Sequence, residues 1–189
     1  MNAKLSNPDY IIFLKDLYEP VQIMNFCQNN RIKNYAYAFV LNLPNSIDSY
    51  LKIGRSAGNE AGERIYRQSG HIPGWNKMLI GPAGSDIKFV IGEYIQHNPQ
   101  HKNLLTKDNI SLRIWDVTNG KNPHMTDYAY LTRVCENQLL EDHEKVYGEL
   151  PIGNPKDTRN EKTQPFVHED HWNNLFVAND NEEVDTVAL

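Results

Sequence analysis

Two neighbouring stretches decide the fold: Tyr35-Ala36-Tyr37-Ala38-Phe39-Val40-Leu41-Asn42, and Lys52-Ile53-Gly54-Arg55-Ser56 shortly after it. Aromatic and aliphatic residues fill the first stretch, which is typical of a β-strand. The segment Leu43-Pro44-Asn45-Ser46 then breaks the run, and Tyr50 to Ile53 resumes it. Two strand-forming runs with a short break between them predict an antiparallel hairpin.

Other elements are expected on both sides of this hairpin. Helices are indicated by apolar residues at a spacing of three or four, by Pro20 at a helix start, and by Gly70 at a helix end. From the N-terminus, we expect a helix over 10–17, a helix from Pro20, the hairpin, a helix from Asn59 to Ser69, a surface loop over 71–86 with Trp75 exposed or half-exposed, strands over 86–94 and 111–117, and a helix over 125–147.

The length and composition predict one domain of the α/β (α+β) class. At 189 residues with 40% hydrophobic residues, the chain is long enough for one core but not for two. We expect a small antiparallel sheet flanked by helices over 33–155, a helical N-terminal extension over 1–32, and a C-terminal extension over 156–189 with an acidic tail.

The cysteines and the N-terminus indicate where the protein resides. Cys27 and Cys135 lie too far apart to suggest a disulfide framework or a paired-thiol metal site. The apolar run over 11–14 is flanked closely by charged residues, so we do not expect a signal peptide or a membrane span. These features predict a cytoplasmic protein with reduced thiols.

Charge is distributed unevenly along the chain, whose formal net charge is -5. Residues 31–77 carry seven basic and three acidic side chains, whereas residues 141–189 carry four basic and twelve acidic ones. A locally basic region suits a polyanionic ligand at one face of the molecule. Lys52, Gly54 and Arg64 would also gather positive charge and backbone N–H groups where a phosphodiester could bind.

Five positions then form a recognisable pattern: Tyr37 in the first strand, Lys52-Ile53-Gly54 in the second, Arg64 on the next helix, Glu136 on the late helix and Asn154 beyond it. Over residues 33–155, this pattern resembles the GIY-YIG nuclease family, and most closely its small type II restriction endonucleases. Tyr-Ala-Phe-Val from Tyr37 stands where the family has Gly-Ile-Tyr, and Lys52-Ile-Gly stands where it has Tyr-Ile-Gly. Some restriction enzymes of the family also have lysine there.

The resemblance implies a catalytic role for each of these residues. It implies that Glu136 binds Mg²⁺, for which Mn²⁺ can substitute, and that Asn154 braces the site; Glu141 is the competing choice of metal ligand. Chemically, Tyr37 would accept a proton from water, directly or through Lys52, and Arg64 would hold the scissile phosphate. Tyr35 is the alternative tyrosine. Arg55 either contacts phosphate or forms a structural salt bridge, and Gln68 stands where related enzymes have a histidine.

The implied function is cleavage of double-stranded DNA at a short sequence by a type II restriction endonuclease. A palindromic site favours a homodimer, because two-fold protein symmetry matches two-fold DNA symmetry. A structure-specific or repair nuclease and a non-catalytic DNA-binding module are the alternatives. Candidate DNA-binding residues lie on the helix over 59–69 and in the loop after it: Arg67, Gln68, His71, Trp75 and Lys77.

Overall fold

A four-stranded antiparallel sheet lies at the centre of the structure, in the strand order β1-β4-β2-β3. The computed structural model describes residues 5–44, 47–58, 61–76, 86–117 and 128–154. The four strands are β1 (Tyr10–Phe13), β2 (Tyr35–Leu41), β3 (Ser49–Ser56) and β4 (Ile110–Asp116). The sheet and its helices confirm the predicted α+β class, and β2 pairs with β3 as the predicted hairpin.

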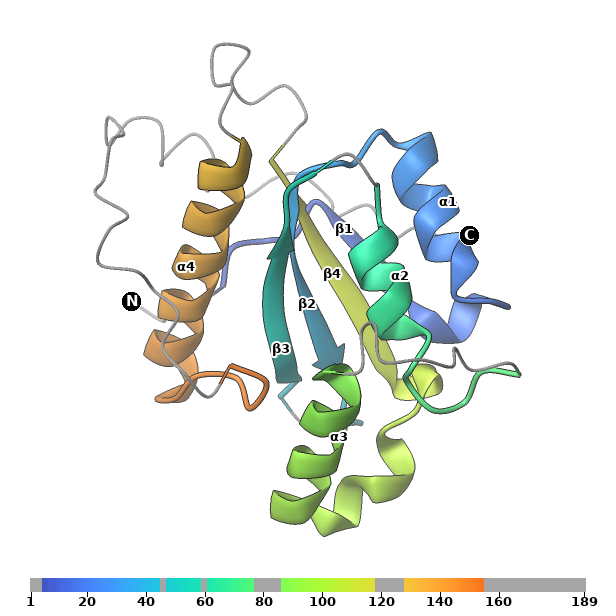
Figure 1. Ribbon diagram of the computed structural model, residues 1–189. Helices are drawn as coiled ribbons and strands as arrows, with labels where there is room; N and C mark the ends of the chain where they lie inside the picture. The colour runs from blue at the N-terminus through green and yellow to red at the C-terminus, as the bar shows by residue number, and fades with distance from the viewer. Residues whose placement is uncertain (1–4, 45–46, 59–60, 77–85, 118–127, 155–189) are drawn as a thin grey trace.

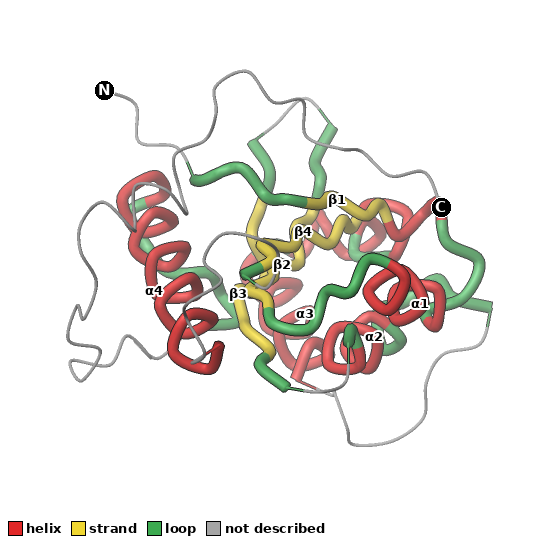
Figure 2. Tube along the Cα trace, turned by 90° about the horizontal axis from the view of Figure 1, so that it is seen from above, coloured by secondary structure: helices red, strands yellow, loops and turns green. Residues whose placement is uncertain are grey.

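Helices cover both faces of the sheet. Helix α4 packs on one face, and α1, α2 and α3 pack on the other (Figures 1 and 2). The α-helices are α1 (Val21–Asn29), α2 (Glu63–Ser69), α3 (Asp86–His97) and α4 (Tyr128–Tyr147), and 3₁₀ helices span Leu14–Asp16, Pro99–Leu104 and Lys107–Asn109.

Strand β2 is buried along its whole length because it is a central strand between these two layers. Its large side chains, Tyr35, Tyr37 and Phe39, join the core cluster on the side of α1, α2 and α3. The small Ala36 and Ala38 face α4 and join the second core cluster. Successive side chains of a strand point to opposite faces. One face of β2 therefore carries large aromatic side chains, and the other carries small alanine side chains.

The β2–β3 hairpin contains an irregularity beside Lys52. Phe39 pairs with Lys52, whereas Val40 pairs with Tyr50, so Leu51 is an extra residue in β3. Such bulges bend a strand and change the direction of its side chains. The bulge places Leu51 in the core on the α3 side, while Lys52 is only partly buried at the sheet edge.

The predicted helix over 10–17 is wrong. Tyr10–Phe13 forms β1 and pairs with β4, and only the short 3₁₀ helix Leu14–Asp16 follows it. Pairing with β4 satisfies the backbone groups of a segment rich in isoleucine and aromatic residues, and this outweighs its weak helical spacing. The segment over 1–32 is therefore not a purely helical extension, because it supplies an edge strand of the sheet.

The predicted strand over 86–94 is also wrong, since α3 spans Asp86–His97. Its buried residues Ile87, Val90, Ile91 and Tyr94 recur at intervals of three and four. That spacing is helical, and it places one apolar stripe against the core. The β-branched residues of the segment favour a strand locally, but the packing of the stripe decides the structure.

The remaining helices begin and end near the predicted positions. Helix α1 starts directly after Pro20, and α2 ends at Ser69 before Gly70. Helix α2 begins at Glu63 after the left-handed Gly62, and Asn59 lies outside the described residues. In the part of the chain that the structure describes, no helix has the length and apolar character needed to cross a membrane.

Candidate functional site

The hairpin brings Tyr37 against Gly54, its partner across the two strands. Tyr37 is fully buried, and its hydroxyl is so close to Gly54 that a Cβ atom there would lie 2.6 Å from it. Only a residue without a side chain leaves room for this contact. The glycine of the Lys52-Ile53-Gly54 motif therefore allows a tyrosine of the neighbouring strand to lie beneath the sheet edge.

An ion pair joins the same strand to α4. The Nε of Arg55 donates a hydrogen bond of 2.9 Å to Oε2 of Glu136, and the two side chains are 32% and 15% exposed. Arg55 is opposite Ala36, so it lies on the α4 face of the sheet. The salt bridge is thus half-buried at the edge of the sheet, where solvent screens it less than on an open surface.

Two further cations lie within electrostatic reach of Glu136. Burial raises the pKa of the Glu136 carboxyl above its usual value, and the positive charges of Arg55, Arg64 and Lys52 oppose that shift. Arg64 is exposed on α2, and Lys52 is partly buried on β3. We call Lys52, Arg55, Arg64 and Glu136 the charged cluster; it combines residues from β3, α2 and α4.

Asn154 braces the strand that carries this cluster. Its Oδ1 accepts a 2.9 Å hydrogen bond from the N–H of Ile53, and its Nδ2 donates a 2.8 Å bond to the Ile53 carbonyl. The N–H of Gly153 donates a 2.8 Å bond to the Leu51 carbonyl. Because β3 is an edge strand, these bonds replace a neighbouring strand and fix the backbone on both sides of Lys52.

Tyr37 and Glu136 approach β3 from different sides. Tyr37 belongs to the core cluster on the side of α1, α2 and α3, whereas Glu136 comes from α4 on the opposite face. The Tyr37 hydroxyl is buried. The structure therefore pairs Arg55 with Glu136, places Arg64 and Lys52 within electrostatic reach of that carboxylate, and puts Tyr37 next to Gly54 without placing the phenol at the surface.

Neither alternative choice is better placed, since Tyr35 is as fully buried as Tyr37. Burial raises the pKa of Tyr35, and the nearby Ser56 hydroxyl only partly offsets this effect, so a Tyr35 phenolate is costly at neutral pH. Glu141 is exposed on α4. It follows Glu136 by five residues, which turns its side chain about 140° away around the helix.

The predicted DNA-binding residues divide between surface and core. Arg67 is exposed and forms an ion pair with Glu63 one turn earlier. Gln68, His71 and Trp75 are each at least nine-tenths buried, which leaves little surface for DNA to contact. The predicted exposure of Trp75 is wrong, because its indole N–H donates a 2.8 Å bond to the Ser69 carbonyl and holds the turn after α2. Lys77 lies outside the described residues.

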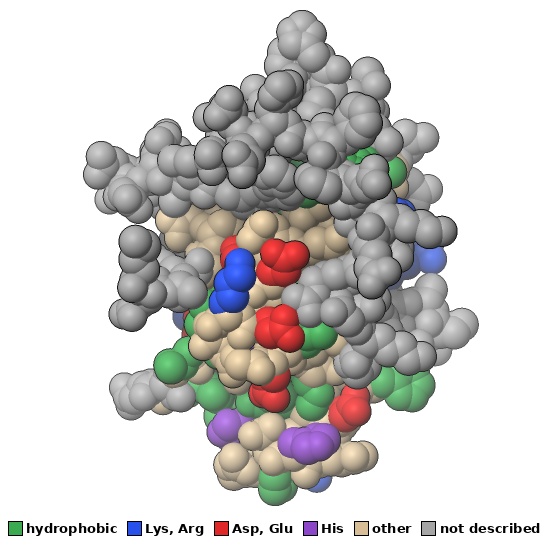
Figure 3. Space-filling model, turned by 90° about the vertical axis from the view of Figure 1, so that its left-hand side faces the viewer, with side chains coloured by type: hydrophobic (Ala, Val, Ile, Leu, Met, Phe, Trp, Pro, Cys, Tyr) green, Lys and Arg blue, Asp and Glu red, His purple; other side chains and the backbone are tan. Residues whose placement is uncertain are grey.

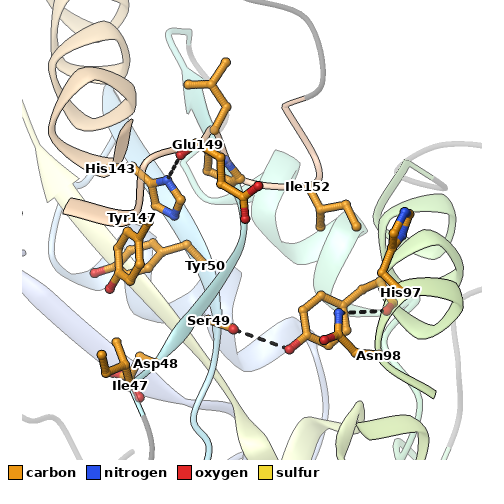
Figure 4. A pocket seen from close by; sticks show the side chains of 13 residues that line it. Ile47, Asp48, Ser49, Tyr50, His97, Asn98, His143, Tyr147, Glu149 and Ile152 are labelled. Carbon is orange, nitrogen blue, oxygen red and sulfur yellow. Dashed lines mark hydrogen bonds between the residues drawn. The ribbon is translucent and has the colours of Figure 1, made fainter. Parts of the chain in front are cut away.

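Sequence reasoning missed a pocket of about 430 Å³ between the C-terminal parts of α3 and α4, beside the start of β3 (Figure 4). The rings of His143 and Tyr147 lie 4.4 Å apart in its wall, and Tyr50 contacts both. Nδ1 of His143 donates to the Glu149 carbonyl at 2.7 Å, and burial lowers the pKa of this histidine. The spacing of His143 and Tyr147 by four helical residues was the signal available in the sequence.

This pocket shares no residue with the charged cluster. The surface around the second half of α4 is mainly acidic, as Figure 3 shows from the α4 side of the molecule. The exposed charged residues there are Glu141, Glu144, Lys145 and Glu149. A polyanion would therefore be repelled from this face and would approach the cluster from the side of α2.

Comparisons of the chain with protein-family models, with curated proteins and with solved structures found no match. The site is thus described by its own geometry and by the sequence pattern alone.

Proposed function

We propose that this protein is a Mg²⁺-dependent endonuclease of the type II restriction class, which hydrolyses phosphodiester bonds of double-stranded DNA at a short sequence. The observation that carries the proposal is the charged cluster: the half-buried carboxylate of Glu136, bonded to Arg55 and influenced by Arg64 and Lys52. Arg55 balances the Glu136 charge, and Arg64 and Lys52 within electrostatic reach leave a net positive charge. Such a site suits a phosphodiester, whose negative charge increases during hydrolysis.

The positions of the cations suggest separate roles. Arg64 is exposed on α2 and can present its planar fork to the oxygens of a phosphate that arrives from solvent. Arg55 forms the salt bridge that was one of its two alternatives, and its charge would then lie next to the phosphate position. Lys52 extends from the bulged, braced part of β3 and would approach the same phosphate from the strand side.

The carboxylate of Glu136 fits a magnesium ion that is bound together with DNA. One oxygen accepts the Arg55 bond, and a carboxylate has further lone pairs for a metal ion. Magnesium commonly uses one or two protein carboxylates and completes its shell with water and substrate phosphate. The three cations disfavour a metal ion on its own, and a phosphate would offset their charge. Mg²⁺ held there would supply Lewis-acid stabilisation of the phosphate oxygens.

The proposed water-activating role of Tyr37 requires its buried hydroxyl to become accessible when DNA binds. The hydroxyl already lies at the strand that carries Lys52, directly against Gly54. Tyr37→Phe tests this role, because phenylalanine keeps most of the packing and removes the oxygen. Wild-type cleavage rates in Tyr37→Phe would assign the ring to packing alone.

The decisive test is digestion of plasmid DNA with Mg²⁺ and with EDTA. Wild-type protein is expected to give discrete fragments with Mg²⁺ only, and Glu136→Gln and Lys52→Ala are each expected to cut at least about 10²-fold more slowly. Glu141→Gln, which removes a carboxylate from the exposed face of the same helix, is the matched control and should cut like wild type. Equal cutting by Glu136→Gln would reject the proposed metal ligand.

Two further measurements separate the alternatives. Branched DNA cut in preference to plain duplex would indicate a structure-specific nuclease, and binding without any cutting would indicate a non-catalytic DNA-binding module. A palindromic cleavage site predicts a homodimer, which sedimentation of the protein with and without its DNA site can detect.

A further inference from the structure

A basic groove of about 600 Å³ lies between α1 and α2, on the side of the sheet away from α4. Arg31, Lys33 and Arg67 contribute three exposed cations to its lining, and Glu63 contributes one carboxylate. The Glu63 carboxylate pairs with Arg67, so Arg31 and Lys33 carry the excess charge. The groove therefore contrasts with the mainly acidic surface of α4 in Figure 3.

Arg31 has an unfavourable backbone conformation for its residue type. Among the residues that the structure describes, Arg31 is the only non-glycine residue with a positive φ, which is 58°. It lies just beyond α1, where the N–H of Arg31 bonds the Gln28 carbonyl at 3.1 Å and the N–H of Ile32 bonds the Cys27 carbonyl at 2.8 Å. This left-handed turn at a helix end usually contains glycine, because a side chain there is strained.

The arginine at this position thus adopts a conformation that its residue type disfavours. Strained residues of this kind tend to occur where the side chain has a function. The exposed guanidinium lines the groove together with Lys33, four and two residues before β2 respectively. The strain and the charge excess are independent observations, one from the backbone and one from the side chains, and both select the same residue.

The two helices that form the groove are held at a fixed distance. Gly62 precedes α2 with φ of 75°, and a Cβ atom there would lie 2.8 Å from Cβ of Cys27 in α1. Cys27 is fully buried, so this contact belongs to the core. The cations of α2 and those beyond α1 are consequently presented on one surface of two closely packed helices.

The groove also lies next to the charged cluster along α2. Arg67 follows Arg64 by three residues, which is nearly one turn and about 4.5 Å along the helix axis. Arg64 acts on Glu136 in the cluster, and Arg67 lines the groove. One face of α2 thus connects the proposed scissile phosphate with a second region of positive charge.

We infer that the groove formed by Arg31, Lys33 and Arg67 binds the sugar-phosphate backbone of duplex DNA beside the phosphate that is cleaved. The identity of the polyanion rests on the proposed function. Contacts of this type fix the position of the duplex without reading its bases. Arg31 and Lys33 were outside the predicted DNA-binding set, which was restricted to α2 and the following loop.

The test measures binding of a 24-base-pair duplex to full-length protein in EDTA, where no cleavage occurs, over a range of salt concentrations. Arg31→Gly and Lys33→Gln are each expected to weaken binding several-fold and to reduce the slope of log K against log salt by about 0.9, the value for one lost phosphate contact. Lys145→Gln removes one exposed positive charge from α4 and is the matched control, with an unchanged slope expected.

Arg31→Gly has a second readout, because it removes the charge and also relieves the strained backbone. Its urea midpoint is expected to increase while its DNA affinity falls. Higher stability together with wild-type affinity and slope would overturn the inference, and so would an equal loss of affinity in Lys145→Gln.

The outcomes also separate this inference from the proposed function. A protein that cuts no DNA but loses duplex binding in Arg31→Gly and Lys33→Gln would refute the endonuclease and support the groove. A protein that cuts DNA with wild-type affinity in both groove variants would support the endonuclease and refute the groove. If the wild-type protein binds no duplex at all, both are refuted.

Discussion

The hydroxyl of Tyr37 lies directly against Gly54, the residue opposite it in the neighbouring strand. This contact ties the two halves of the sequence pattern together, since Tyr37 comes from the first strand of the hairpin and Gly54 from the second. It also fixes the register, because a shift of one residue would place the ring against the side chain of Ile53 or Arg55.

Gly54→Ala is expected to destabilise the protein by about 1–3 kcal/mol, the usual cost of adding a methyl group to a packed site. The added Cβ would lie 2.6 Å from the Tyr37 hydroxyl and 2.7 Å from Cζ, so the ring must move. Urea denaturation measures the loss. Gly92→Ala in α3 is the control, because no atom beyond its own stretch of helix backbone lies within 4 Å of the added Cβ. Alanine should be neutral or stabilising at that helical position.

Glu136→Gln is expected to unfold at the same or a higher urea concentration than wild type at pH 7. The folded state raises the pKa of Glu136, chiefly by burial, so the neutral form is favoured in the fold. A raised carboxyl pKa means that stability falls as pH increases through the unfolded and then the folded pKa. The variant lacks this penalty. Its advantage over wild type should therefore be small at pH 4 and larger at pH 7, measured in EDTA.

A lower stability of Glu136→Gln at pH 7 would show instead that the Arg55 ion pair outweighs the cost of burial. The expected combination, unchanged or increased stability with lost cleavage, is characteristic of a residue kept for function at some cost in stability.

Asn154→Ala is expected to cost about 1–3 kcal/mol, because the N–H and carbonyl of Ile53 would each lose a buried partner. Hydrogen exchange provides a local readout: the Ile53 amide should exchange faster than in wild type, beyond the change in global stability. Asn98→Ala, which removes one half-buried bond to the Tyr94 carbonyl, is the control and should leave Ile53 exchange unchanged. Unaltered Ile53 exchange in Asn154→Ala would contradict the bracing role.

His143 should make stability depend on pH below neutrality. Burial lowers its pKa in the folded state, so the unfolded state takes up the proton more readily as pH falls below about 6.5. Stability is then fully present above that pH and decreases through the window down to the folded pKa. His143→Asn, which keeps a donor near Nδ1, should flatten this part of the curve.

The matched control for that measurement is the same substitution at the exposed His97. Its Nδ1 also bonds a backbone carbonyl one turn away, but its side chain is not buried. A pH profile of His143→Asn that matches wild type would show that other groups produce the dependence.

The hairpin could be predicted from sequence because two physical signals agreed there. Aromatic residues alternate with small ones in β2, and a proline-containing break precedes β3. At Tyr10–Phe13 and Asp86–His97 the signals conflicted, and each prediction followed the wrong one. Tertiary pairing with β4 decided the first segment, and the helical spacing of buried residues decided the second.

The charged cluster was predictable as a set of residues but not as a geometry. Lys52 and Arg55 are close together in the sequence. Arg55 and Glu136 are 81 residues apart, so their contact could not be predicted from the sequence. The burial of Gln68, His71 and Trp75 could not be predicted either, because it depends on how the turn after α2 packs on the core. Arg31 was overlooked for a related reason: its backbone conformation is visible only in the structure.

The bonds from Asn154 to Ile53 span 101 positions of the chain. During synthesis on the ribosome, the hairpin can form early because its strands are adjacent, but the open edge of β3 stays uncovered until residues 153 and 154 emerge. An uncovered edge invites pairing with another chain. Nascent chains stalled before this point should therefore be the most prone to self-association, and a short peptide that mimics the Gly153-Asn154 turn would compete with that association.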